Sequence, residues 1–239
     1  MTLPLQDRFA LVTGATRGIG QAAALALAEA GAHVIALGRT QGGLEALDDA
    51  IFASTGQHAT LVPLDLRKPE DLDALGAHLY ERFGRLDIVV HAAAVLGGLS
   101  PTGHIEPKSW DQTIAVNLTA TWRLIRSFEP LLRASEAGRA IFLTTGRVPR
   151  PKAFWAPYAA SKAGMEALVK CWADEMEQTA IRAVLLDPGA VRTRMRAEAY
   201  PGEDPLDLPE PSALGPLFVD LASRADLPAM PETILFQAT

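Results

Sequence analysis

Cysteine is nearly absent from this chain, because Cys171 is the only one among its 239 residues. A single cysteine excludes an intramolecular disulfide and a cysteine-rich metal cluster. No apolar run approaches the roughly 20 residues that a membrane-spanning helix needs. The amino-terminal segment lacks a basic stretch followed by an apolar one, so no secretory signal is expected. These absences predict a cytoplasmic protein that does not enter a membrane.

An excess of positive charge is absent as well. The formal net charge is −6, so the chain is not expected to bind nucleic acid through its phosphates. The five histidines show no spacing typical of metal ligands, and neither G-x-S-x-G nor G-x-x-x-x-G-K-S/T occurs. Hydrophobic residues make up 49% and charged residues 21%, which is typical of a globular chain. The length favours one domain over residues 1–239.

Short apolar runs alternate with helix-like stretches, a rhythm typical of parallel βα units. Strands are expected at 8–13, 32–37, 59–64, 86–91, 140–145, 181–187 and 234–237. Helices are expected at 19–30, 43–53, 69–83, 110–133 and 157–178. The fourth and fifth strands are apolar on both faces, as in a sheet that is covered by helices on both sides. The predicted fold class is therefore α/β with a doubly wound parallel sheet.

The composition changes once, at Pro201–Pro216, which contains five prolines and four acidic residues. This stretch follows the sixth expected strand. Ligand crevices of open α/β sheets lie beyond the carboxyl ends of the strands, so residues 192–216 are predicted to cover a substrate. A proline-stiffened surface loop without a ligand is an equally good interpretation.

The turn after the first expected strand has the glycine spacing G-x-x-x-G-x-G, from Gly14 through Gly18 to Gly20. Gly14 would allow a tight reversal, Gly18 would let a pyrophosphate approach the backbone, and Gly20 would let helix and strand pack closely. The helix that follows presents free N–H groups to a phosphate. The position of this turn after the first strand of a βαβ unit favours a dinucleotide site.

The second βα turn indicates which coenzyme fits. An NAD site usually has an acidic residue at the end of the second strand, whereas Arg39 and Thr40 stand there in this chain. Arg39, together with Arg17, could bind a 2′-phosphate, so NADP(H) is favoured over NAD(H). Both arginines could instead be solvated charges. Asp65 could accept from the adenine amino group or could cap the next helix.

Tyr158 and Lys162 lie four residues apart on an expected helix, so the phenol and the ammonium can converge on one ligand. A phenol is a poor base near neutrality because its ordinary pKa is about 10. A neighbouring cation favours the phenolate, and Tyr158 could then exchange a proton with an alcohol or carbonyl oxygen.

These motifs together resemble the ordinary, non-extended short-chain dehydrogenase/reductase family over about the whole chain. The matching elements are the glycine turn, Asp65-Leu66, Asn117, the Tyr158–Lys162 pair, and Pro188-Gly189 followed by Thr193. The resemblance implies a seven-stranded parallel sheet in the order 3-2-1-4-5-6-7. It also implies hydride transfer between NAD(P)H and a carbonyl or alcohol carbon.

The resemblance further implies roles for individual residues. Tyr158 would be the acid/base, Lys162 its activator and a ribose ligand, and Asn117 would hold a water of a proton relay, although a helix kink or a buried hydrogen bond also explains an asparagine there. Thr145 stands where the family has a serine. The residues implied to bind the coenzyme are Gly14, Thr16, Arg17, Gly18, Ile19, Gly20, Arg39, Thr40, Asp65, Leu66, Ala92, Ala93, Lys162, Pro188, Gly189, Val191 and Thr193.

Three departures from the family pattern stand out. Threonine at 145 keeps the hydroxyl but adds a methyl group. The usual Asn-Asn-Ala-Gly is replaced by His91–Ala94, which removes a bracing asparagine and requires a negative φ at Ala94. The carboxyl-terminal TILFQAT lacks the common glycine pair.

The sequence therefore predicts an NADP(H)-dependent oxidoreductase that acts on a small or medium-sized carbonyl compound or secondary alcohol. Phe154 and Trp155 are candidates to line an apolar substrate pocket, or they serve as core anchors. Small residues on the Tyr158 helix and the family resemblance imply a homodimer or homotetramer. Cys171 is expected in the core or at an interface. The alternative function is a non-enzymatic protein that binds a dinucleotide as a sensor or scaffold.

Overall fold

The computed structural model describes residues 2–237, in which seven parallel strands form one sheet. Their order is β3-β2-β1-β4-β5-β6-β7, which confirms the predicted topology. The strands are β1 Phe9–Thr13, β2 His33–Gly38, β3 Thr60–Pro63, β4 Ile88–His91, β5 Arg139–Leu143, β6 Arg182–Asp187 and β7 Thr233–Leu235. The chain order reverses between β1 and β4, and parallel sheets of this kind bind ligands at such a switch point.

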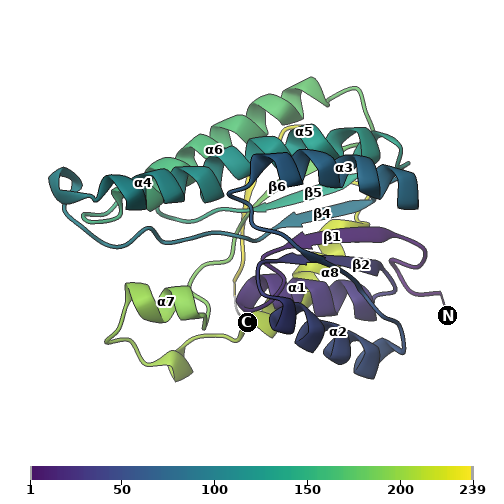
Figure 1. Ribbon diagram of the computed structural model, residues 1–239, viewed down its shortest axis with the longest axis horizontal. Coiled ribbons are helices and arrows are strands. Elements are labelled where there is room, and N and C mark those ends of the chain that lie inside the picture. Colours follow the sequence, from purple (N-terminus) through teal and green to yellow (C-terminus); the bar gives the residue numbers. More distant parts are fainter. Residues whose placement is uncertain (1, 238–239) are drawn as a thin grey trace.

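Helices cover both faces of the sheet (Figure 1). Alternate strand residues point to opposite faces. Leu11 therefore packs with α3, α5 and α6, while Ala10 and Val12 pack with α1, α2 and α8. The longer helices are α1 Gly18–Glu29, α2 Gln41–Thr55, α3 Pro69–Phe83, α4 Pro107–Ile114, α5 Ala120–Arg133, α6 Ala156–Glu175, α7 Arg194–Ala199 and α8 Gly215–Ser223. The sheet is thus buried between two apolar layers.

One predicted helix is interrupted. The sequence predicts a single helix over 110–133, but α4 and α5 are joined by a π-helical turn at Ala115–Thr119. Asn117 lies in this turn and is fully buried. Turns of this type insert one residue into the helical ladder and often mark functional positions.

The segment after β6 differs most from the expectation. The sequence predicts an irregular stretch at Pro201–Pro216, but two short 3-10 turns form within it, at Pro205–Asp207 and Pro211–Leu214. Helix α7 precedes this stretch, and α8 begins at Gly215. Pro216 is compatible with the first turn of a helix. Phe218 and Leu221 of α8 are fully buried against the face that α1 covers, and this tertiary packing is not visible as a local pattern.

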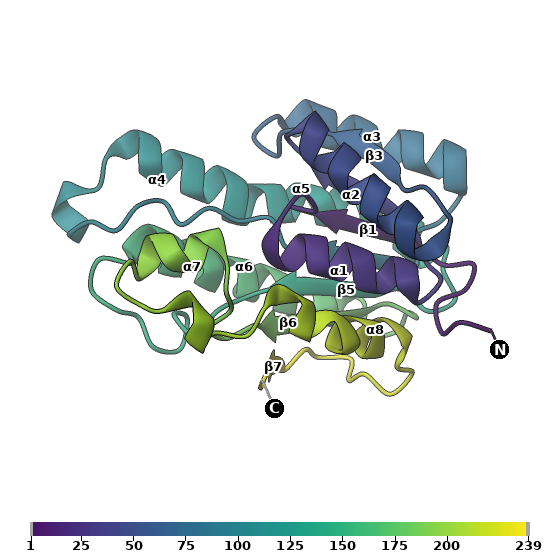
Figure 2. The ribbon, with the colours of Figure 1, turned by 90° about the horizontal axis from the view of Figure 1, so that it is seen from below.

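Both views place α4 and α7 beyond the carboxyl ends of the strands (Figures 1 and 2). Two strand ends were predicted wrongly in this region: β5 ends at Leu143, so Thr145 lies in the following loop, and β7 runs over Thr233–Leu235. Cys171 is exposed and is therefore not a core residue. None of the described helices combines the length and the apolar character that a membrane span requires.

Candidate active site

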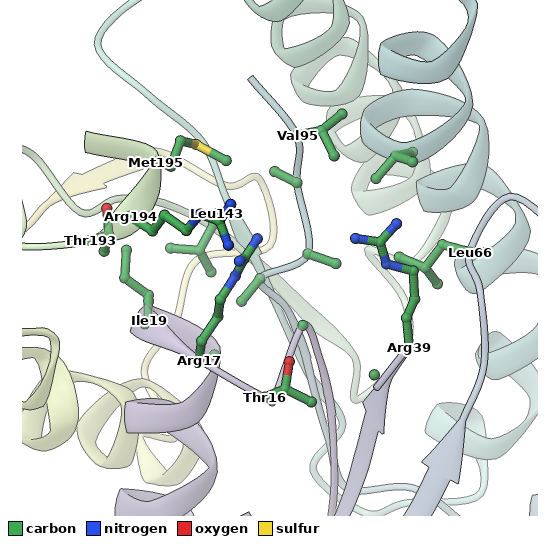
Figure 3. Close-up of a pocket in the computed structure, with 18 of the residues that line it drawn as sticks. Thr16, Arg17, Ile19, Arg39, Leu66, Val95, Leu143, Thr193, Arg194 and Met195 are labelled. Atoms are coloured by element: carbon green, nitrogen blue, oxygen red, sulfur yellow. The ribbon is translucent and has the colours of Figure 1, made fainter. Parts of the chain in front are cut away.

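A cleft of about 570 Å³ lies along the carboxyl ends of the strands. Its walls come from the turn after β1, the ends of β2, β3 and β4, helix α6 and the segment after β6 (Figure 3). The predicted site residues that line it are Gly14, Thr16, Arg17, Gly18, Ile19, Gly20, Arg39, Thr40, Asp65, Leu66, Ala92, Ala93, Tyr158, Lys162, Pro188 and Thr193. Four other predicted residues, Asn117, Thr145, Gly189 and Val191, do not line this cavity.

The glycine turn has a packed side and an open side. A Cβ atom at Gly14, where φ is +67°, would lie 2.9 Å from the Ala93 backbone, and one at Gly20 would collide with the Gly14 carbonyl oxygen. At Gly18 the nearest neighbour of such an atom would be the Thr193 methyl group at 3.5 Å. The open side of the turn therefore faces the cleft, as binding of a pyrophosphate requires.

The first turn of α1 adds to this cradle. Arg17 at the N-cap makes no side-chain hydrogen bond to the helix, so the first N–H groups of α1 receive no side-chain cap. Such groups, with the positive end of the helix dipole, favour an anion. The shape and charge of this part of the cleft fit a dinucleotide phosphate.

Two arginines lie at the end of the cleft where the sequence predicts the adenosine part of the coenzyme. Arg17 and Arg39 are exposed and form no ion pair within residues 2–237. Figure 3 shows Arg39 on the side of Leu66. Asp65 lines the cleft, but Arg67 donates to both its carboxylate oxygens and holds the pKa of that carboxyl below its ordinary value. Asp65 does not cap α3, whose N-cap is Lys68.

Tyr158 and Lys162 are buried side by side in α6, with 8% and 1% of their surface exposed. Burial raises the pKa of the Tyr158 phenol to about 12, the negative charge of Asp187 adds to the rise, and a hydrogen bond from the Thr145 hydroxyl opposes it. In the protein alone the pKa of Tyr158 is therefore raised rather than lowered, and stabilisation of the phenolate by Lys162 stays a prediction. Loss of solvation outweighs the other effects.

Lys162 is held in place through its ammonium group. Nζ donates to the Leu143 carbonyl oxygen at 2.7 Å, at the end of β5. Burial lowers the pKa of Lys162 to about 8, while the charge of Glu166 acts to raise it. The Glu166 carboxylate, one turn further along α6, accepts a hydrogen bond from the Thr144 hydroxyl. Burial thus destabilises the positive charge of Lys162, and the negative charge of Glu166 stabilises it.

Asn117 joins the loop after β4 to α6. Its side-chain amide donates to the Val95 carbonyl oxygen at 2.9 Å and to Ser161 Oγ at 3.0 Å, while Oδ1 accepts from the Val95 N–H at 2.9 Å. These contacts match both alternatives raised for this residue, a helix irregularity and a buried hydrogen bond. The water relay stays a prediction, since protein groups already make three of the four hydrogen bonds that this side chain can form.

Comparisons with known proteins agree with this arrangement. The short chain dehydrogenase family model matches residues 8–204. The chain belongs to the short-chain dehydrogenase family. It is 38% identical over 217 residues to the uncharacterized oxidoreductase YciK of Escherichia coli K12, covering 90% of this chain and 86% of YciK.

Two solved structures of short-chain dehydrogenases contain a coenzyme. One from Escherichia coli CFT073, in complex with NADPH, has a TM-score of 0.93, 36% identity and 98% coverage of both chains. Another from Shigella flexneri 2a, in complex with NADP, has a TM-score of 0.93, 35% identity and coverage of 98% of this chain and 99% of that one. The fold of this short-chain dehydrogenase is therefore shared with proteins that bind NADP(H).

The His91–Ala94 departure is compensated locally. Thr13 Oγ1 lies 2.8 Å from His91 Nδ1 and accepts from the Ala93 N–H, so Thr13 and Asn117 brace the loop in place of the missing asparagine. Ala94 keeps a negative φ, as expected. Burial, together with the Lys162 charge, lowers the pKa of His91 to about 3, so the imidazole is neutral near pH 7.

The predicted coenzyme residues of the segment after β6 differ from one another in their contacts. Gly189 has a φ of +65° and donates its N–H to Asp187 Oδ1 at 3.0 Å, which shapes the turn. Val191 is 3% exposed and packs in the core, so its side chain points away from the cleft. Thr193 caps α7 by accepting from the Arg196 N–H at 3.1 Å.

An apolar wall adjoins Tyr158. Leu96, Trp155 and Tyr158 form a buried cluster against Met195 and Tyr200. The Trp155 ring lies 5.9 Å from the Tyr158 ring, edge to face. Phe154 is instead half exposed and has a φ of +74°, a strained value that sets the direction of the chain into α6. Trp155 therefore packs in a buried cluster beside Tyr158, and its contact with a substrate stays a prediction.

Sequence reasoning missed several residues of this short-chain dehydrogenase site. Asp187, at the end of β6, raises the pKa of Tyr158, and Glu166 on α6 raises that of Lys162. Thr144, after β5, donates a hydrogen bond to Glu166. Only Glu166 left a sequence signal, since it continues the four-residue spacing from Tyr158 through Lys162. Within residues 2–237, no group of three or more His, Cys, Asp or Glu side chains is placed to hold a metal ion.

Proposed function

We propose that this protein is an NADP(H)-dependent oxidoreductase that reduces a carbonyl compound to a secondary alcohol, with Tyr158 as the proton donor. The observation that carries the proposal is the buried Tyr158–Lys162 pair in the wall of a cleft whose far end carries Arg17 and Arg39. Family membership and the NADP(H) complexes of two relatives support the same coenzyme.

The chain's own groups would act on the substrate oxygen. When bound, the nicotinamide supplies the hydride that the carbonyl carbon accepts. Tyr158 donates its proton to the oxygen, and the Thr145 hydroxyl orients that oxygen by hydrogen bonding. Lys162, held by the Leu143 carbonyl, stabilises the phenolate that remains and binds the coenzyme ribose.

The pKa of Tyr158 supports the reductive direction. At about 12, it keeps the phenol protonated near neutral pH, so the side chain is ready to give a proton rather than to take one. Alcohol oxidation needs the phenolate, which forms only as the pH rises toward that value. We therefore expect reduction near neutral pH and oxidation only at higher pH.

The substrate side of the cleft is apolar. Trp155, Met195 and Tyr200 adjoin Tyr158. Residues 192–216, the predicted substrate cover, contribute residues 192–195 and Pro211 to the lining of the cleft. A carbonyl compound with an apolar body fits this wall.

Tyr158→Phe tests the proposal, with Tyr80→Phe as the matched control because Tyr80 is 56% exposed on α3. NADPH oxidation is measured against a panel of ketones and aldehydes. Removing the proton donor is expected to lower kcat about 100-fold or more, while NADPH binding stays within a few-fold of wild type. Undiminished turnover would refute the role of Tyr158. NADPH binding without turnover on any substrate would favour the sensor.

We also propose that the chain forms a homodimer or homotetramer through α5 and α6. Trp122 of α5 is 43% exposed, and the small residues Ala160 and Ala163 are exposed on α6, which would allow close helix packing. Light scattering on a size-exclusion column measures the mass, and a monomer of 25.5 kDa at micromolar concentration would contradict this part.

A further inference from the structure

The loop between β5 and α6, residues 144–155, carries charge of one sign only. Its charged residues are Arg147, Arg150 and Lys152, and it contains no acidic residue, although the chain as a whole has a net charge of −6. The loop starts after β5 and ends directly before α6, the helix that holds Tyr158. The proposed reaction gives these three cations no role.

Arg147 is connected to the reacting end of the cleft through its backbone and its side chain. Its N–H donates to Thr145 Oγ1 at 3.3 Å, the hydroxyl proposed to orient the substrate oxygen. Its guanidinium lies over the Trp155 ring, 5.6 Å from the ring centre, and the Trp155 ring packs edge to face on Tyr158 at 5.9 Å. A single indole ring therefore connects the guanidinium to Tyr158.

Most hydrogen-bond donors of Arg147 have no partner among residues 2–237. The half-buried side chain forms no ion pair there, and Nη1 donates only to the Arg150 carbonyl oxygen, at 3.5 Å. A contact with the face of an indole leaves the five in-plane N–H donors of a guanidinium unused. Asp187 lies near the preceding residue, since its Oδ2 would be 3.3 Å from a Cβ at Gly146, yet it does not pair with Arg147. The guanidinium is thus left to bind an external anion.

Two further cations lie over the apolar wall, and only one of them is neutralised. The Arg196 guanidinium lies 3.8 Å from the centre of the Tyr200 ring, and its Nε and Nη2 donate to the Glu203 carboxylate. Lys152 Nζ lies 5.3 Å from the centre of the same ring and forms no ion pair in the described part of the chain. Arg147 and Lys152 therefore give the edge of this wall a positive charge.

We propose that the carbonyl substrate carries a carboxylate, and that Arg147 binds this group while Lys152 adds to the attraction. This inference rests on the proposed reductase function and names the substrate class of the same site. The planar fork of a guanidinium matches the two oxygens of a carboxylate. Because an indole ring connects Arg147 to Tyr158, the acid group is expected about one aromatic ring away from the carbonyl, with the apolar body of the substrate along Trp155.

A pair of ketones that differ only in charge tests the substrate class. The probes are para-acetylbenzoate and its methyl ester, each reduced with NADPH by the wild-type protein. The ester keeps the ring and the ketone, so the ratio of the two kcat/KM values reports on the acid group alone. A charge-assisted hydrogen bond is expected to favour the acid by about tenfold or more, mainly through a lower KM.

Substitutions test the assignment to Arg147. Arg147→Gln is expected to lower the acid-to-ester ratio of kcat/KM about tenfold, and Arg147→Lys to restore part of it, because lysine keeps the charge but lacks the fork. Arg150→Gln is the matched control and is expected to keep the ratio. Arg150 is an exposed residue of the same loop, and within residues 2–237 its side chain forms no ion pair and lies over no aromatic ring.

Two results with these variants would overturn the assignment. An equal loss for acid and ester in Arg147→Gln would show that Arg147 only packs on Trp155. An equal fall of the ratio in Arg150→Gln would show a general effect of net charge on the approach of an anion, without a specific contact.

Binding separates this inference from the reductase proposal. Calorimetry with saturating NADP gives the Kd values of the two corresponding alcohols, one with the carboxylate and one with the methyl ester. If neither ketone is reduced but the acid binds more tightly and this preference is lost in Arg147→Gln, the reductase proposal is overturned and the carboxylate site stands. Equal kcat/KM values for acid and ester overturn the carboxylate inference alone. Absence of both turnover and binding overturns both.

Discussion

The two ends of the cleft use charge in opposite ways. At the reacting end, Tyr158 and Lys162 are almost fully buried, and loss of solvation displaces their pKa values to about 12 and about 8. At the phosphate end, Arg17, Arg39 and Arg194 are exposed to solvent. Burying an ionisable group destabilises its charged form and shifts its pKa, which suits proton transfer. An exposed charge has little effect on stability and contributes to the binding of an anionic ligand.

This difference predicts which properties of the protein a substitution changes at each end of the cleft. A change at the reacting end should alter both turnover and stability, because the same burial that tunes a pKa also destabilises the charged form. A change at the phosphate end should alter coenzyme affinity and leave stability almost unaffected. The following predictions test this division.

Lys162→Met should produce the largest effect. Turnover is expected to fall at least about 100-fold, since the phenolate of Tyr158 loses its supporting cation. Stability is expected to rise, because an unbranched apolar side chain replaces a buried ammonium that has one carbonyl partner, Leu143. The pKa of Lys162 is lower in the folded protein than the ordinary 10.5, so its charge destabilises the fold fully below about pH 8, and this cost disappears as the pH rises toward 10.5.

Urea unfolding at pH 7 and at pH 9.5 measures this gain, which can reach about 3 kcal/mol at the lower pH. Lys108→Met is the matched control, because Lys108 is exposed on α4 and forms no ion pair within residues 2–237. An equal gain in both variants, or a gain in Lys162→Met that grows with pH, would contradict the buried-charge explanation.

Arg39→Asp should have an intermediate effect confined to coenzyme choice. A carboxylate at the end of β2 repels a 2′-phosphate and can accept from a ribose hydroxyl, so the ratio of NADPH to NADH affinity is expected to fall about 10- to 100-fold. The midpoint of urea unfolding should not move. Arg82→Asp, at an exposed position of α3 outside the cleft, controls for net charge. An unchanged affinity ratio would show that Arg39 does not contact the 2′-phosphate.

The contrast between the two ends also explains what could be predicted from the sequence. The glycine turn, the arginines that follow it and β2, and the Tyr158–Lys162 spacing are local patterns, and the structure brings them to one cleft as expected. The strand order followed from the resemblance and is confirmed. A backbone requirement such as the φ of +67° at Gly14 favours glycine directly, so the glycine in the sequence predicts the turn.

Properties that depend on tertiary neighbours could not be read in this way. The pKa of Tyr158 depends on burial and on Asp187, which is 29 positions away in the chain and lies at the end of another strand. Helix α8 depends on Phe218 and Leu221 packing in the core with α1 rather than on a local signal. Arg192 donates to Glu210 and Arg196 donates to Glu203, whereas Arg194 contacts neither carboxylate. Only the tertiary structure distinguishes these three arginines.

Glu166→Gln should give the smallest effect and the sharpest test of coupling at the reacting end. Its carboxylate is nearly buried, and its charge raises the pKa of Lys162 against the effect of burial. The amide oxygen of glutamine can still accept from the Thr144 hydroxyl, so the packing is kept while the charge is lost. Lys162 should then lose its proton at a lower pH than the value of about 8 in the wild-type protein.

The measurement is the pH profile of kcat for carbonyl reduction. The wild-type rate is expected to fall above about pH 8, as Lys162 becomes neutral and no longer stabilises the phenolate left by proton transfer. In Glu166→Gln this fall should begin at lower pH, which gives a loss of a few-fold at pH 8 and almost none at pH 6. A uniform loss at every pH would instead indicate a packing defect at the contact with Thr144, because only a change in the protonation of Lys162 produces a loss that depends on pH.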